Sequence, residues 1–242
     1  MEKHTMSWYS HNLHKDMPIV SYGYSGFALL LVPTAAADYL EYERFQLIDA
    51  LAHFINTGKI KVFSVNSINN ESWLNNNISG HQKIERHQQF NNYIYDEVIP
   101  FIKTNTSPET PVVISGASFG ALHSMNLYLK RPDLINGVIA MSGVYDLTEY
   151  SKGFYNDEVY FNSPIHYIPN LTNHDTLTQI RNGKIVLATG SGAYEDPEAN
   201  RRFSGVLQSK GIGHIIDIWG TDITHDWPTW RKMLPYFIDT KF

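Results

Sequence analysis

The chain has 242 residues, 43% of them hydrophobic and 13% aromatic, with 19 Lys and Arg, 24 Asp and Glu, and no cysteine. The net charge of −5 argues against a nucleic-acid partner or an anionic membrane surface, because both require clustered basic residues. The lack of cysteine excludes disulfide scaffolds, thiolate zinc sites, iron–sulfur clusters and a cysteine nucleophile. This length predicts a single domain over residues 1–242.

The predicted elements begin with two alternating segments, residues 6–13 and 19–24, which favour an antiparallel hairpin at a sheet edge. Short apolar runs then predict buried strands. In chain order these runs are Phe27–Val32, 61–65, 111–115, Gly137–Met141, Lys184–Thr189 and 214–219. Between and after them, apolar residues at helical spacing predict helices. These helices cover residues 39–56, 83–102 with a kink near Pro100, 121–130, 197–210 and 227–237.

Two segments lack this periodicity. Residues 66–80 are rich in Asn and predict a loop. Residues 143–182 mix aromatics, Pro and Asn over a length unusual for a plain connection, so we interpret them as a pocket or lid insertion. The alternation of strands and helices predicts an α/β fold, with a mostly parallel, twisted sheet covered by helices on both faces.

The most informative motif is Gly116-Ala117-Ser118-Phe119-Gly120, which lies between a β-branched strand and an apolar helix. In that context Gly-x-Ser-x-Gly predicts a nucleophile elbow, with the Ser118 hydroxyl exposed at the end of the strand. The helix N-terminus would stabilise an oxyanion, with the Phe119 N–H as one donor. A second donor is expected after Phe27–Val32, from Thr34 or Ala35, with Ala35 preferred.

A serine nucleophile needs a base, which in this architecture comes last in the chain. His225 follows the last predicted strand and precedes the last helix, so it fits best among eleven histidines. The histidine in turn needs a carboxylate. Asp196 is preferred because it precedes Pro197 and the next helix; Glu195 is close behind, and Asp146 is a third candidate.

The sequence predicts no cofactor and no metal. It contains neither a Gly-Lys-Ser/Thr loop nor Gly-x-Gly-x-x-Gly, and the His11/His14 pair has no third ligand nearby. The N-terminus shows no signal peptide, and the longest apolar run, Phe27–Val32, is far below the ~20 residues of a membrane span. We therefore expect a cytoplasmic protein with a small-molecule ester substrate and no membrane partner; a homo-oligomer is left open.

Three segments resemble one known family. Gly116 to Gly120, the stretch Met141-Ser142-Gly143-Val144-Tyr145-Asp146, and His225-Asp226-Trp227 followed by Trp230-Arg231 are similar to the putative-esterase branch of the α/β-hydrolases. That branch includes the esterase D, feruloyl esterase and enterobactin esterase types. The resemblance implies an α/β-hydrolase fold, a Ser–acid–His triad with Ser118 and His225 in the matching places, no cofactor, and hydrolysis of carboxylic esters.

The leading hypothesis is a serine esterase that works through an acyl-enzyme. Acyl transfer to another alcohol by the same triad, or a non-catalytic binding protein on this fold, are the alternatives. Aromatic residues near the expected site would suit an aryl or sugar-linked ester, or would simply pack the core and lid. These residues are Tyr145, Tyr150, Phe154, Tyr155, Tyr160, Phe161 and Trp227.

Overall fold

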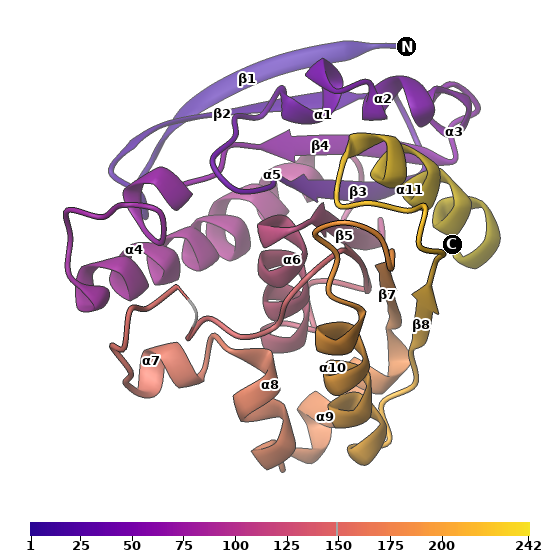
Figure 1. Cartoon of the computed structure of the whole chain (residues 1–242). Coiled ribbons are helices and arrows are strands. Elements are labelled where there is room, and N and C mark those ends of the chain that lie inside the picture. The colour runs from indigo at the N-terminus through magenta and orange to yellow at the C-terminus, as the bar shows by residue number, and fades with distance from the viewer. Residues whose placement is uncertain (149) are drawn as a thin grey trace.

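The computed structural model describes residues 1–148 and 150–242, and its centre is one eight-stranded sheet (Figure 1). The strand order is β1-β2-β4-β3-β5-β6-β7-β8. The strands are β1 (Lys3–Ser10), β2 (Lys15–Tyr22), β3 (Phe27–Val32), β4 (Ile60–Val65), β5 (Val112–Ala117), β6 (Gly137–Met141), β7 (Lys184–Thr189) and β8 (Ile215–Ile218). Neighbours from β4 to β8 pair in parallel, whereas β1 pairs with β2 and β2 with β4 antiparallel. The predicted edge hairpin and mostly parallel sheet are confirmed.

Helices cover both faces, as the alternating pattern predicted (Figure 1). One face carries α1 (Glu41–Arg44), α2 (Leu47–Ala50), α3 (Ala52–Asn56) and the C-terminal α11 (Trp227–Lys241). The other carries α4 (Gly80–Tyr93), α5 (Ile99–Thr104), α6 (Phe119–Lys130), α9 (His174–Asn182) and α10 (Pro197–Ser209). Leu29 and Leu31 of β3 face the first layer and Leu30 faces the second, so this strand is buried on both sides.

One helix prediction needs correction, and the structure locates the distortion of another. Residues 39–56 form three short helices. Gln46 separates the first two, because it adopts a left-handed conformation with φ of 62°, which a continuous α-helix cannot contain. The distortion expected near Pro100 lies just before it, in the π-helical segment η2 (Ile94–Val98). A proline ring clashes with the carbonyl four residues earlier, and the wider π-turn accommodates it.

The two segments without periodicity also contain short helices. Residues 66–80 hold the 3₁₀ turn η1 (Asn69–Glu71), whose Asn69 is buried. Within 143–182 lie α7 (Asp157–Tyr160), α8 (Pro164–Tyr167), η3 (Ile168–Asn170) and α9. Among the described residues no helix is both long and apolar enough to span a membrane.

Candidate active site

Ser118 forms a strained turn between β5 and α6. Its backbone has φ of 57° and ψ of −123°, a region that non-glycine residues rarely adopt. A Cβ on Gly116 would lie 2.3 Å from the Gly120 carbonyl oxygen, and one on Gly120 would lie 2.5 Å from those of Val32 and Pro33. Both positions therefore require glycine, and the turn they permit sets Ser118 at the carboxyl end of β5, with the Phe119 N–H at the start of α6.

Two loops beyond the sheet are joined by backbone hydrogen bonds. Gly192 N, in the loop after β7, donates to Ile223 O (2.9 Å), in the loop after β8. In the other direction, His225 N donates to Ala193 O (3.1 Å). A Cβ on Gly192 would lie 2.6 Å from the Ile223 oxygen, so only glycine allows this close approach. The pairing brings His225 beside Glu195.

Glu195 is the carboxylate that contacts His225. Its Oε2 lies 3.5 Å from His225 Nδ1, with side chains 0% and 24% exposed respectively. Ser142 Oγ donates to Glu195 Oε1 (2.7 Å) and Thr189 Oγ1 to Oε2 (2.9 Å). Burial alone would raise the pKa of Glu195, but the hydrogen bonds from His225, Ser142 and Thr189 outweigh it and hold the pKa below its ordinary value. Glu195 therefore carries a buried negative charge.

The other two acidic candidates, Asp196 and Asp146, have different partners. Asp196 is the N-cap of α10 and accepts from Ala199 N at 2.8 Å. An aspartate before Pro at the first turn of a helix serves this capping role well. Asp146 accepts from Thr148 and lies 3.6 Å from His166, a different histidine.

A short chain of contacts links Ser118 to this pair. Ser118 N donates to Met141 O (2.9 Å) at the end of β6, and the next residue, Ser142, bonds Glu195. Trp230 Nε1 donates to Ser142 Oγ (3.0 Å), and the Trp230 ring packs edge-on against His225, with centroids 5.2 Å apart. Among the described residues, nothing hydrogen-bonds to Ser118 Oγ in this conformation. Such contacts are often long without substrate and tighten when it binds.

The loop after β3, Pro33 to Ala37, is the one expected from the sequence to supply the second oxyanion donor, and we call it the oxyanion loop. Thr34 N donates to Oε2 of the buried Glu41 at 2.9 Å, and Thr34 Oγ1 donates to Oε1. This occupies the Thr34 N–H, whereas the Ala35 N–H has no acceptor among the described residues. Of the two donors considered from the sequence, only Ala35 retains a free N–H at an exposed position.

The aromatic residues predicted near the site are dispersed. Tyr150 meets Phe119 edge-to-face, with centroids 4.5 Å apart, close to the elbow. Tyr145 stacks on Phe203 in the core, and Trp227, the first residue of α11, packs against Tyr42 and Phe45.

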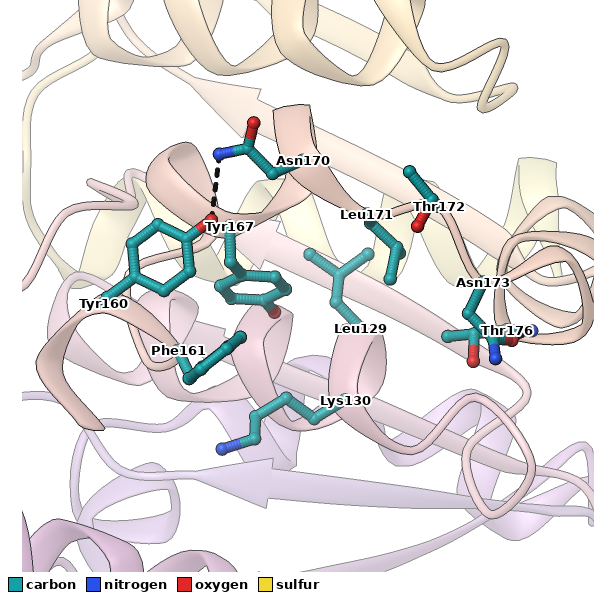
Figure 2. Close-up of a pocket in the computed structure, with 10 residues that line it drawn as sticks. All are labelled: Leu129, Lys130, Tyr160, Phe161, Tyr167, Asn170, Leu171, Thr172, Asn173 and Thr176. Atoms are coloured by element: carbon teal, nitrogen blue, oxygen red, sulfur yellow. Dashed lines mark hydrogen bonds between the residues drawn. The ribbon is translucent and has the colours of Figure 1, made fainter. Parts of the chain in front are cut away.

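Tyr160 and Phe161 instead border a cavity of about 440 Å³ at the far end of α6 from Ser118 (Figure 2). That end lies about 17 Å along the helix from the serine. The lining includes Lys130, whose burial lowers its pKa to about 8. This cavity is thus remote from the reacting groups.

The sequence did not identify Ser142 and Thr189 as partners of Glu195, or Trp230 as a partner of Ser142 and His225. Ser142 directly follows β6, and Thr189 is the last residue of the neighbouring strand β7. The available signal for these partners was a pair of hydroxyl residues at the ends of adjacent predicted strands. Only the fold shows which carboxylate these hydroxyls contact.

Comparisons with known proteins identify the family and the fold. Residues 66–236 match the family described as Putative esterase. The fold is similar to a ferulic acid esterase (TM-score 0.76, 16% identity, 98% of each chain covered). It is also similar to an S-formylglutathione hydrolase from Staphylococcus aureus (TM-score 0.70, 14% identity, 98% of this chain and 95% of that one). A third similar structure is the enterobactin esterase from Shigella flexneri (TM-score 0.68, 17% identity), where the match covers 99% of this chain and 59% of that one. No curated protein sequence matches the chain. These likenesses confirm the predicted α/β-hydrolase fold.

Proposed function

The chain belongs to the putative esterase family and is a carboxylic ester hydrolase, and we propose that it acts through Ser118, His225 and Glu195. The observation that carries this assignment is the buried Glu195 carboxylate, 3.5 Å from His225 Nδ1, on a loop tied to the one that bears the histidine. A charged acid on Nδ1 leaves Nε2 as the basic nitrogen that can take a proton from serine.

The proposed reaction passes through an acyl-enzyme. His225 Nε2 takes the Ser118 proton as Oγ bonds to the ester carbonyl carbon, and the carbonyl oxygen becomes an oxyanion. The N–H groups of Phe119 and Ala35 are the proposed donors to that oxygen. The imidazolium, stabilised by Glu195, then protonates the leaving alcohol as the C–O bond breaks. Water repeats the sequence on the acyl-enzyme and releases the acid.

Two surroundings bear on the substrate. Tyr150 is partly exposed and meets the buried Phe119 edge-to-face, so its ring offers aromatic surface next to the elbow. A cavity of about 250 Å³ borders the oxyanion loop, and its polar side chains come from Asp38, Asn66, Ser67 and Asn70. Aromatic surface favours an aryl group, and a polar cavity lining favours a hydroxylated group. We propose that the substrate is an ester that joins an aromatic or short acyl group to an alcohol carrying further hydroxyl groups.

The test is hydrolysis of p-nitrophenyl esters from acetate to octanoate and of acetylated sugars, by wild type and Ser118→Ala in parallel. Turnover that falls ~10³-fold or more in the variant supports the serine mechanism. Equal rates in both proteins would refute it. Addition of an alcohol acceptor to the same reactions distinguishes acyl transfer, because a new ester then appears beside the free acid.

A further inference from the structure

The oxyanion loop is held by a side chain from a distant part of the sequence. Asn69, in the 3₁₀ turn η1, is 1% exposed, and its Nδ2 donates to Ala35 O at 2.7 Å and approaches Thr34 O at 3.5 Å. Ser67 Oγ donates to the same Ala35 oxygen at 3.0 Å. The carbonyl and N–H of a trans peptide point in opposite directions. Because the Thr34 carbonyl faces Asn69, the N–H of the same peptide, that of Ala35, points away from it.

Asn69 is in turn held by helix α6. Its Oδ1 lies 3.0 Å from Nε2 of His123, a residue that is 2% exposed. Since Asn69 Nδ2 already donates to the loop, Oδ1 is the acceptor, and His123 Nε2 must carry the proton. Burial lowers the pKa of His123 to about 3, so the ring is neutral and donates from this one nitrogen.

Helix α6 also carries the other oxyanion donor. Phe119 is its first residue, and the Phe119 ring packs against His123 with centroids 4.9 Å apart. One rigid helix therefore presents the Phe119 N–H at its start and, about one turn later, the imidazole that orients Asn69.

We propose that the buried His123–Asn69 pair is a positioning device that ties the oxyanion loop to helix α6, so that the Phe119 and Ala35 N–H groups keep a fixed spacing. The inference rests on the proposed function, in which these two groups hold the oxyanion. Oxyanion donors act only at about 2.7–3.1 Å from the developing charge. The two donors come from segments that follow different strands, β3 and β5, and the buried pair joins those segments through side chains.

The experiment separates positioning from mere structural support. Asn69→Leu removes both hydrogen bonds, and Asn69→Asp keeps an oxygen for His123 but removes the donor to Ala35. His123→Leu removes the other end of the pair, and His123→Gln restores an N–H donor. For each variant, kcat and KM are measured on p-nitrophenyl acetate, together with affinity for an aryl trifluoromethyl ketone, which forms a tetrahedral oxyanion on the serine.

We expect Asn69→Leu and Asn69→Asp to lower kcat by roughly 10- to 100-fold with little change in KM, and to weaken ketone binding by a similar factor. His123→Gln should retain more activity than His123→Leu. Asn91→Leu is the matched control. Asn91 is equally buried, but its amide bonds Asn162 (2.8 Å) rather than the loop, so this variant should keep wild-type kcat and ketone affinity even if its melting temperature falls.

The outcomes are distinct. If the Asn69 variants keep kcat and ketone affinity within about two-fold of Asn91→Leu, the pair is only structural and the inference fails. Should Asn69→Leu fail to fold, Asn69→Asp and His123→Gln decide the same point. If instead the wild type shows no Ser118-dependent turnover, the proposed function itself fails, and this is established before any Asn69 variant is compared.

Discussion

The exchange of Glu195 for Gln tests the assignment of the acid most sharply. Glu195 Oε2 lies 3.5 Å from His225 Nδ1, and the Glu195 side chain is fully buried. At an effective dielectric constant of about 20, two unit charges at that separation interact by about 5 kcal/mol. The imidazolium forms only during the reaction, so most of this energy applies to the transition state and not to the resting enzyme. Glutamine keeps the shape and an acceptor oxygen but loses the charge, which predicts a fall in kcat/KM of roughly 10³- to 10⁴-fold.

Asp196→Asn is the matched control, because asparagine caps a helix as well as aspartate does. Its kcat/KM should stay within about two-fold of wild type, since Asp196 bonds Ala199 N and not His225. Both variants are assayed on p-nitrophenyl acetate, with folding checked by thermal melting. The reasoning is refuted if Glu195→Gln keeps more than about a tenth of wild-type kcat/KM, or if Asp196→Asn loses as much as Glu195→Gln. Asp146 would then become the candidate to test.

Three further predictions concern the same site. Gly120→Ala places a Cβ 2.5 Å from two backbone oxygens and should lower the free energy of unfolding by about 1–3 kcal/mol, measured as a lower melting temperature. Gly205→Ala in α10, where the new Cβ has nothing within 4 Å, should raise the melting temperature. Equal shifts in the two variants would contradict the steric argument. Ser142→Ala removes one donor to Glu195 and should lower kcat about ten-fold while leaving KM nearly unchanged, and a change confined to KM would count against it. Because the folded state lowers the pKa of Glu195, its charge stabilises the fold above its unfolded pKa of about 4.3, and this contribution is lost as pH falls through the lower, folded value. Urea unfolding from pH 7 to pH 3 should therefore show the stability gap between wild type and Glu195→Gln closing at acid pH, and a constant gap would refute the linkage.

The sequence by itself determined the parallel strands and the elbow. Phe27–Val32 and Gly137–Met141 contain no polar side chain, the centre of Lys184–Thr189 is apolar from Ile185 to Ala188, and the structure has strands at the bounds of all three runs. A buried parallel strand must be apolar on both faces, so its pattern is legible locally. Gly116 and Gly120 are legible for the same reason, because a tight turn from strand to helix limits the residues it can contain.

Tertiary structure alone decided which polar residues meet. Glu195 and Asp196 are chain neighbours with equivalent chemistry. They differ only in their partners, because Glu195 accepts from the hydroxyls of Ser142 and Thr189 whereas Asp196 caps α10. Asn69 lies in a polar stretch that predicted a loop, yet it is buried between the oxyanion loop and His123. Such hydrogen bonds join residues far apart in the sequence and depend on how loops cross the sheet edge. No local periodicity encodes them.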